Sequence, residues 1–172
     1  MGPILHGNQF ILRPLKYSDA EALARHANDA EVARFLRPSF PHPYFLYDAQ
    51  KFIRWVQENE DQYILAIEVE GEASGAIGIH RTFMLRRQVW EVGYWLGQAH
   101  WNKKIMTEAL GKMLEYYVPA LRIKEIYASI YEPNMASSKV LQKCGFTLLS
   151  SLNGVMIRDG SQVTEQVWIK RF

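Results

Sequence analysis

One carboxylate stands out in an otherwise apolar segment of the chain. Glu91 is the single acidic residue in the run Val89–Leu96, and His80 is the one histidine in the preceding run, Gly75–Phe83. In apolar surroundings the pKa of a carboxylic acid rises, so we expect Glu91 to titrate closer to neutral pH, as suits a general base. His80 is the rival candidate for this role. The simpler alternatives are a solvated glutamate at a sheet edge and a histidine satisfied within the core.

The other reactive side chains do not form a recognisable site of their own. Cys144 is the only cysteine, which excludes an intrachain disulfide and any cysteine-cluster metal site. It has no evident His or Asp partner, so we expect a small hydrophobic residue rather than a nucleophile. The histidines lack the spacing of metal ligands, and no metal is expected; they are His6, His26, His42, His80 and His100.

The composition indicates one folded domain. A length of 172 residues fits one domain, and 48% hydrophobic residues can fill its core, so we expect a single domain over residues 1–172. Twenty basic against eighteen acidic residues leave a net charge of +2, too small for a dedicated nucleic-acid or membrane-surface binder. No apolar run reaches the roughly 18 residues of a membrane span. The start of the chain, MGPILHGNQF, lacks the pattern of a signal peptide, so a cytoplasmic location is expected.

Apolar residues with a period of two predict strands, and those with a period near 3.6 predict helices. The segment 89–131 reads as strand, helix and strand, which favours a parallel pair with a right-handed crossover. Short turns join the strands before it, which should pair antiparallel. The expected fold is α/β, a mixed α+β sheet with helices on both faces. The expected strands are 9–13, 63–69, 75–83, 89–96, 123–131, 147–157 and 163–170, and the expected helices are 19–28, 29–36, 48–58, 102–118 and one that opens at Pro133-Asn134.

Three stretches resemble a known family: EVGYWL from Glu91, HWNKKIMTEAL from His100 and IYASIYEPNMASSKVLQKCGF from Ile126. They are similar to the GNAT superfamily of acyl-CoA-dependent N-acyltransferases, most of all to its RimJ/RimL branch of ribosomal-protein N-terminal acetyltransferases. FILRPLKYSDAEAL from Phe10 and RDGSQVTEQVWIK from Arg158 fit this branch too. The resemblance implies a GNAT fold with a central twisted sheet of about seven strands. It also implies an N-acetyltransferase that moves the acetyl group of acetyl-CoA to a primary amine by direct attack on the thioester.

The loop that would hold the CoA pyrophosphate departs from the branch pattern. That loop often reads Trp-Gly-Lys-Gly-Tyr-Ala-Thr, whereas this chain has Asn102, Lys104 and Met106 at the small positions. Glycine lets a ligand approach the backbone, and a left-handed non-glycine residue costs roughly 1–2 kcal/mol. Lys103 and Lys104 add cationic donors at a helix N-terminus, which offsets part of this loss. Either CoA binds through backbone amides and lysines, or the chain is a non-catalytic or weakly active GNAT-like binding or regulatory protein with impaired CoA binding.

The resemblance also implies roles for individual residues. Glu91 would take the proton of the acceptor ammonium, directly or through a water molecule. Ser137 would hydrogen-bond the thioester sulfur, in place of the tyrosine that many GNAT enzymes carry at the position of Leu141; capping its helix is the alternative role. Gly93 is a candidate bulge that splays the strand from its neighbour, where a backbone N–H would donate to the oxyanion. The residues expected to bind CoA are Trp95, Leu96, Gly97, Trp101, Asn102, Lys103, Lys104, Ile105, Met106, Thr107, Asn134, Ser137 and Lys143.

The sequence leaves the acceptor open. A protein N-terminus follows from the branch, and a lysine, a polyamine, an amino acid or an antibiotic amine are alternatives. Arg81, Arg86 and Arg87 flank a predicted hairpin turn, either as solvated charges or as a docking site for an acidic acceptor. Members of the branch often form homodimers, which makes a second copy of the chain a candidate partner. Nucleic acids and membranes are not expected partners.

Overall fold

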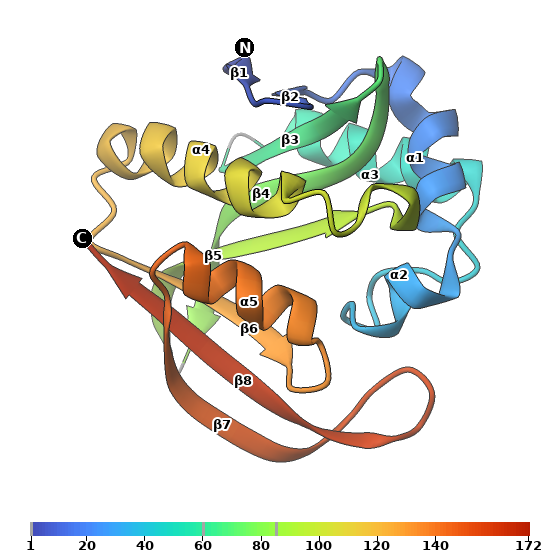
Figure 1. Ribbon diagram of the computed structural model, residues 1–172. Helices are drawn as coiled ribbons and strands as arrows, with labels where there is room; N and C mark the ends of the chain where they lie inside the picture. Colours follow the sequence, from blue (N-terminus) through green and yellow to red (C-terminus); the bar gives the residue numbers. More distant parts are fainter. Residues whose placement is uncertain (1, 60, 85) are drawn as a thin grey trace.

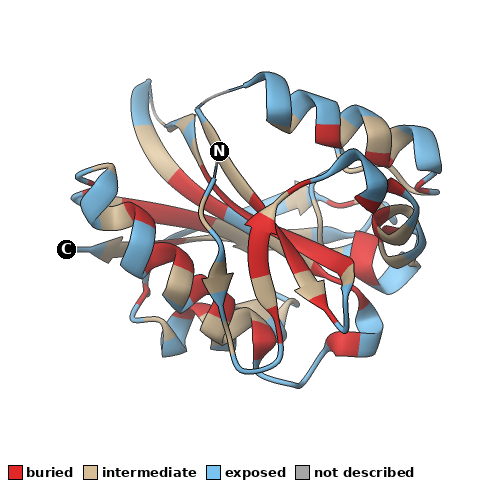
Figure 2. Cartoon of the chain, turned by 90° about the horizontal axis from the view of Figure 1, so that it is seen from above, coloured by how far each residue is buried: buried red, intermediate tan, exposed pale blue. Residues whose placement is uncertain are grey.

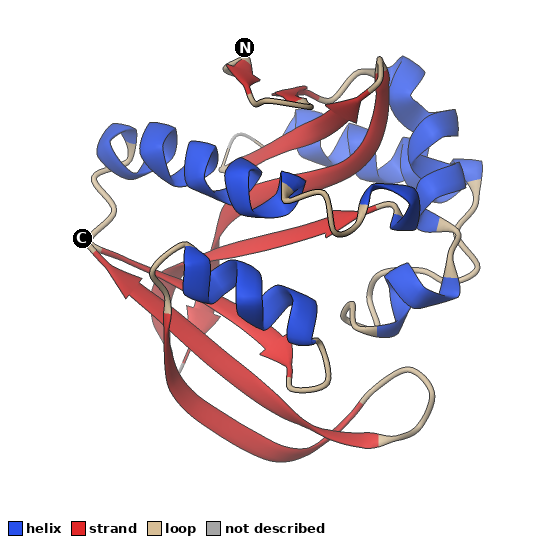
Figure 3. Cartoon of the chain, in the orientation of Figure 1, coloured by secondary structure: helices blue, strands red, loops and turns tan. Residues whose placement is uncertain are grey.

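A computed structural model describes residues 2–59, 61–84 and 86–172 of the chain. Its strands form one sheet of eight, in the order β1-β2-β3-β4-β5-β6-β8-β7, with helices on both faces (Figures 1 and 3). This confirms the predicted fold class. The strand count exceeds the expected seven because the two-residue strand β1 adds one more at the edge. Within the described ranges, no helix combines the length and apolar character needed to cross a membrane.

The predicted elements are present with shifts of a few residues at their ends. The strands are β1 (Leu5–His6), β2 (Ile11–Pro14), β3 (Gln62–Val69), β4 (Glu72–Met84), β5 (Arg87–Leu96), β6 (Glu125–Tyr131), β7 (Thr147–Met156) and β8 (Gln162–Arg171). The helices are α1 (Ala20–Ala27), α2 (Ala30–Arg34), α3 (Leu46–Glu58), α4 (Ile105–Ala120) and α5 (Met135–Lys143), with two short 3-10 helices, η1 (Tyr17–Asp19) and η2 (Gln98–His100).

The sheet contains one parallel pair, β5 with β6, as the sequence predicts. Their pairing is restricted to Trp90 with Ile126 and Glu91 with Tyr127, and the two strands then separate. β5 stays in register with β4 through Gly93, so the predicted bulge at Gly93 is wrong. The separation arises because β6 leaves β5, not because β5 is distorted. Backbone groups along the last residues of β5 thereby lose their neighbour on that side.

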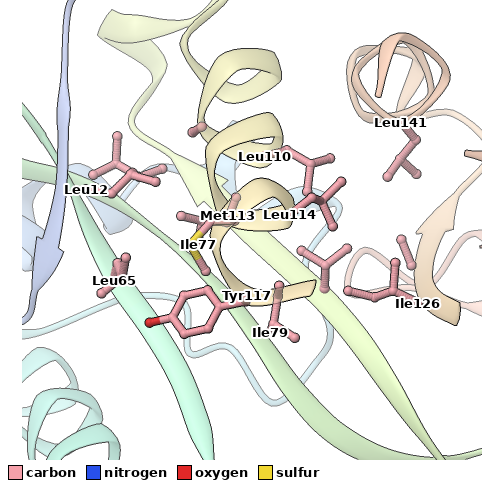
Figure 4. Packing of buried hydrophobic residues seen from close by; sticks show 14 of the residues in the cluster. Leu12, Leu65, Ile77, Ile79, Leu110, Met113, Leu114, Tyr117, Ile126 and Leu141 are labelled. Carbon is pink, nitrogen blue, oxygen red and sulfur yellow. The ribbon is translucent and has the colours of Figure 1, made fainter. Parts of the chain in front are cut away.

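Two apolar clusters hold the layers together. On one face, Leu110, Met113 and Tyr117 of α4 pack against β4 residues such as Ile77 (Figure 4). On the other face, α1 and α3 cover the sheet with small and branched side chains. Buried residues concentrate along the central strands and on the helix faces turned toward them (Figure 2). Because burial of each large aliphatic side chain contributes about 1.5–3 kcal/mol, these clusters fix how the ends of β5 and β6 lie relative to α4 and α5.

Helix α4 differs from its predicted bounds at both ends. It begins at Ile105 rather than Asn102, because Asn102 and Lys104 adopt left-handed backbone conformations, each with φ of 62°. It also runs through Pro119 to Ala120. Proline near the end of a helix removes only one backbone hydrogen bond, so Pro119 does not terminate the helix where it stands.

Helix α5 begins where the sequence predicts, directly after Asn134. The Asn134 side chain accepts a hydrogen bond from the backbone N–H of Ser137 at 3.1 Å, which is an N-cap. Gly145 follows the helix with φ of +81°, the left-handed conformation that glycine adopts without strain. The cap orients the first turn of α5, and with it the Ser137 side chain, toward the gap beside β5.

Candidate active site

A pocket of about 530 Å³ opens between the end of β5, the loop before α4 and the first turns of α5. The short helix α2 and the residues after it form its remaining wall, with Val32, Phe35 and Leu36. All the residues expected to bind CoA line this pocket except Gly97; they are Trp95, Leu96, Trp101, Asn102, Lys103, Lys104, Ile105, Met106, Thr107, Asn134, Ser137 and Lys143. The sequence pattern did not indicate the α2 wall, because no motif marks it.

Gly97 lies behind the pocket wall. Its N–H donates to the backbone oxygen of Ser74 at 2.8 Å, and a Cβ here would come within 2.5 Å of His26 Nδ1. A side chain at this position would therefore collide with His26. Since backbone groups alternate along a strand, Trp95 also directs its N–H toward β4, whereas Tyr94 and Leu96 direct theirs toward the gap.

The loop before α4 adopts left-handed backbone conformations, which glycine favours, although it contains no glycine. Asn102 and Lys104 both have φ of 62°, in the left-handed region. Asparagine tolerates this region better than most residues, whereas lysine gains nothing from it, so the strain falls mainly on Lys104. Both residues are exposed at the rim of the pocket. The larger residues therefore occupy this loop in a left-handed backbone of the kind that glycine adopts.

The start of α4 is suited to an anion. Among the described residues no side chain caps this helix at Lys104, and the first N–H groups of a helix lack intrahelical partners. Lys103 and Lys104 precede the helix on the pocket rim. Lys139 and Lys143 reach the same pocket from α5, four residues apart on one helix face. Lys139 was missed, although its spacing from Lys143 is the signal that would have indicated it.

Trp101 fixes the end of β5 against the loop. Its indole Nε1–H donates to the Leu96 carbonyl at 2.7 Å, while the residue remains 38% exposed at the pocket rim. Trp95 packs against the apolar cluster beneath α1 and α3. Its ring meets the Phe40 ring edge-on, with 5.8 Å between the ring centroids. Both aromatic residues therefore combine packing with lining of the pocket.

Glu91 lies outside this pocket, deeper along β5, in a cluster of charged groups. It is 4% exposed, and its Oε1 is 2.6 Å from Arg37 Nη2. His80 Nε2, from the neighbouring strand, lies 3.5 Å from the other carboxylate oxygen. Burial alone would raise the pKa of Glu91, but hydrogen bonding to His80 and the charge of Arg37 outweigh it and lower that pKa. The expected rise is wrong, because partners from distant segments surround the carboxylate.

Cys144 behaves as the sequence predicts for a structural thiol. It is half-buried, and its Sγ lies 3.4 Å from the backbone oxygen of Thr107 between α4 and α5. Burial raises the pKa of this thiol, which keeps it protonated and unreactive near neutral pH. Within the described part of the chain, no cluster of His, Cys, Asp and Glu side chains has the arrangement of a metal site.

Comparison with known proteins identifies the family. The family described as Acetyltransferase (GNAT) domain matches residues 9–147. The protein named Uncharacterized N-acetyltransferase YoaA, from Bacillus subtilis (strain 168), is 28% identical over 182 residues, which cover 98% of this chain and 96% of that protein.

Two solved structures share the fold at lower identity. RimL, a ribosomal L7/L12 alpha-N-protein acetyltransferase in complex with coenzyme A, is 18% identical, with a TM-score of 0.84 over 99% of this chain and 98% of its own. MccE, the microcin C7 self immunity acetyltransferase in complex with acetyl-CoA and AMP, is 23% identical, with a TM-score of 0.80 over 96% and 94%. Because the family match spans every residue that lines the pocket, this chain belongs to the GNAT acetyltransferase family.

Proposed function

We propose that the protein is an N-acetyltransferase of the RimJ/RimL type, which transfers the acetyl group of acetyl-CoA to a primary amine by direct attack on the thioester. The observation that carries this proposal is the pocket that joins the anion-binding start of α4 to the gap between β5 and β6. Complexes of RimL with coenzyme A and of MccE with acetyl-CoA support the choice of donor. We further propose that residues 1–172 act as one domain in the cytoplasm.

The CoA pyrophosphate would bind at the start of α4. Free backbone N–H groups there and the helix dipole attract an anion, and the left-handed Asn102 and Lys104 keep the loop turned around it. Lys103, Lys139 and Lys143 add charge on both sides of the pocket mouth. Those features weigh against the alternative, a GNAT-like binding or regulatory protein with impaired CoA binding.

The pantetheine arm would follow the gap beside β5. Beyond Glu91 the strand has no β6 partner, so backbone groups of Tyr94 and Leu96 are available to the amides of the arm. The Trp101 indole N–H already donates to the Leu96 carbonyl and fixes the strand end, which leaves the Leu96 N–H and the Tyr94 groups for the arm. A backbone N–H in this stretch would donate to the oxyanion of the tetrahedral intermediate.

Glu91 would accept the proton of the acceptor ammonium, directly or through a water molecule, and so free the amine lone pair for attack on the thioester. Its lowered pKa keeps it ionised near neutral pH, as a base must be, although a weaker base than predicted. An acceptor ammonium would have to take the place of the Arg37 guanidinium at this carboxylate. Such an exchange replaces one cation by another and leaves the buried carboxylate paired throughout.

Ser137 would lie at the thioester end of the donor. It is half-buried in the first turn of α5, and its backbone N–H is already bound to the Asn134 side chain, so only its hydroxyl remains for a ligand. A hydroxyl hydrogen bond would orient the sulfur without protonating it outright. A protein N-terminus and other primary amines are the candidate acceptors. A second copy of the chain is a separate candidate partner, in a homodimer.

Calorimetric titration with acetyl-CoA and CoA tests the donor, and release of CoA thiol in the presence of amines tests the transfer. We expect binding of both nucleotides and thiol release that depends on the amine. Suitable acceptors are a peptide with a free N-terminus, the same peptide with a blocked N-terminus and a lysine side chain, and a polyamine. Absence of both binding heat and a thermal shift at saturating CoA would overturn the proposal in favour of the non-catalytic alternative.

A further inference from the structure

Tyr94 lines the pocket, and its hydroxyl oxygen is buried without a partner at ordinary hydrogen-bond geometry among the described residues. Buried polar groups in folded proteins are almost always paired, and an unpaired one destabilises the free protein. The hydroxyl is therefore either a structural defect or a group whose partner belongs to a bound ligand. Its position decides between the two.

Tyr94 lies on β5, three residues beyond the last position at which β5 pairs with β6. Its ring belongs to the apolar cluster beneath α4 and α5, so the side chain is fixed by packing. Ser137 and Cys144 are close enough to act on its hydroxyl. These two residues lie seven apart, Ser137 in the first turn of α5 and Cys144 at its C-cap, on either side of the fully buried Leu141.

Leu141 stands where many GNAT enzymes carry a tyrosine, and an aliphatic side chain donates no hydrogen bond. The Tyr94 hydroxyl reaches the same stretch of α5 from the strand instead of from the helix. Because Tyr94 also lines the pocket, a donor exists near Ser137 that the sequence pattern of α5 does not reveal. Given the proposed function, on which this step rests, the ligand group nearest to Ser137 is the thioester sulfur.

We propose that the Tyr94 hydroxyl donates a hydrogen bond to the sulfur of the bound acyl-CoA and stabilises the departing thiolate. In the transfer, the amine lone pair forms the new C–N bond. When the tetrahedral intermediate collapses, the C–S bond breaks and its electron pair stays on sulfur. The ammonium proton passes to Glu91 or water. Tyr94 keeps its own proton throughout.

The acid–base properties of the group agree with hydrogen bonding rather than with proton transfer. Burial raises the pKa of Tyr94, a weak side-chain interaction with the nearby Ser137 hydroxyl, short of ordinary hydrogen-bond geometry, lowers it by less, and the Cys144 thiol raises it further. A thiol of ordinary pKa, about 8.5, is the stronger acid, so its thiolate does not remove the proton from this phenol. A hydrogen bond to a charged acceptor is stronger than one to a neutral acceptor, so it favours the thiolate over the thioester.

Tyr94→Phe removes the hydroxyl and keeps the ring, and Tyr117→Phe is the matched control. Tyr117 is a buried tyrosine of the same apolar cluster, on α4, and it does not line the pocket. We expect Tyr94→Phe to lower kcat about tenfold to a hundredfold with little change in KM for acetyl-CoA, as for loss of a hydrogen bond to a charged group. Tyr117→Phe should change kcat by no more than about twofold, because the hydroxyl that it removes does not contact a ligand.

A second measurement separates the proposed contact from a structural effect. The thiol of bound CoA is titrated by the ultraviolet absorbance of its thiolate, in wild type, Tyr94→Phe and Tyr117→Phe. A donor to sulfur favours the thiolate, so the thiol pKa should rise in Tyr94→Phe alone. The melting temperature of the free protein should not fall in Tyr94→Phe, since an unpaired hydroxyl is removed.

The outcomes distinguish this inference from the proposed function. Wild-type protein that does not bind CoA overturns both. Wild-type protein that binds CoA, with the same thiol pKa and kcat in Tyr94→Phe, overturns only the role of Tyr94. A rise in thiol pKa of equal size in both variants also overturns it, because a general loosening of the core would then be the cause.

Discussion

Arg37 and Glu91 form an ion pair of 2.6 Å between a loop and the centre of the sheet. The Arg37 side chain is 58% exposed, whereas that of Glu91 is 6% exposed. A largely solvent-exposed cation therefore covers the inner carboxylate. Since a buried carboxylate must stay paired, removal or replacement of this cation has to change both the acidity of Glu91 and its access to an amine.

Arg37→Ala should move the acid limb of the pH profile of kcat/KM to higher pH. The charge of Arg37 helps to lower the pKa of Glu91. A base acts only when deprotonated, so activity falls as pH drops through its pKa, and a lower pKa extends activity to more acid pH. Without Arg37 the pKa of Glu91 rises, and activity is lost earlier on acidification. The measurement is kcat/KM over a pH series in both proteins.

Arg34→Ala is the control for this prediction. Arg34 is an exposed arginine of α2 that pairs with Glu31 at 3.7 Å and does not contact Glu91. Its removal should leave the acid limb in place. If Arg37→Ala folds normally and its acid limb coincides with that of wild type, the titrating base is not Glu91.

Glu91→Gln should lower kcat/KM by about a hundredfold, the usual contribution of a positioned general base. Glutamine keeps the shape of the side chain, and the exposed Arg37 can turn to solvent, so the fold should persist. The loss should be larger for a lysine acceptor, with a pKa of about 10.4, than for an α-amine near 8, because fewer lysines are neutral without a base. Steady-state rates with the two acceptors test this.

His80→Gln is the comparison for the base role. His80 contacts the same carboxylate at 3.5 Å and is the other candidate identified from the sequence. A small loss in His80→Gln beside a large one in Glu91→Gln identifies Glu91 as the base. The reverse order would transfer the role to His80.

The elements of the fold were predictable because their signals are local. Alternating apolar residues mark β5, and the helical stripe of α4 continues through Leu110 and Met113. Asn134 carries its capping signal in its own side chain, and the structure confirms it. The start of α4 was misplaced, since the spacing of apolar residues does not report a left-handed backbone at Lys104.

Contacts between residues far apart in the sequence could not be predicted from the sequence. Arg37 meets Glu91 across 54 positions of sequence, from a loop without periodicity. The expected rise in the pKa of Glu91 considered only the apolar neighbours on its own strand. Tyr94 lies within the predicted strand 89–96, but whether its hydroxyl finds a partner depends on how α5 packs over it.

Lys104→Gly should stabilise the free protein while weakening CoA binding. Lysine in a left-handed conformation is strained by roughly 1–2 kcal/mol, and glycine relieves this, less the entropy that glycine adds to the unfolded chain. We expect a gain of about 0.5–1 kcal/mol in the free energy of unfolding. The gain is measured by urea denaturation, and the loss of a cation from the pocket rim by calorimetry with CoA.

Lys104→Ala separates strain from charge. Alanine retains the strained φ and removes the cation, so its CoA affinity should match that of Lys104→Gly while its stability stays near wild type. Asn102→Gly should gain less stability than Lys104→Gly, because asparagine tolerates positive φ. Equal stabilities of the glycine and alanine variants would show that the loop relaxes from the left-handed conformation in solution.

Lys139→Ala and Lys143→Ala should each weaken CoA binding by about two- to fivefold at low salt, as expected for exposed ion pairs. Both lysines line the pocket from one face of α5, opposite the start of α4, so they can reach phosphate groups that Lys103 does not. The losses should shrink as salt screens the charges. Lys51→Ala removes an exposed lysine of α3; it is the control and should not change the affinity for CoA.

Titration with CoA and with dephospho-CoA shows which phosphate each lysine contacts. A variant that loses affinity for CoA but not for dephospho-CoA contacts the 3′-phosphate. A variant that loses affinity for both contacts the pyrophosphate. Affinities equal to wild type at low salt for both lysine variants would remove α5 from the phosphate site.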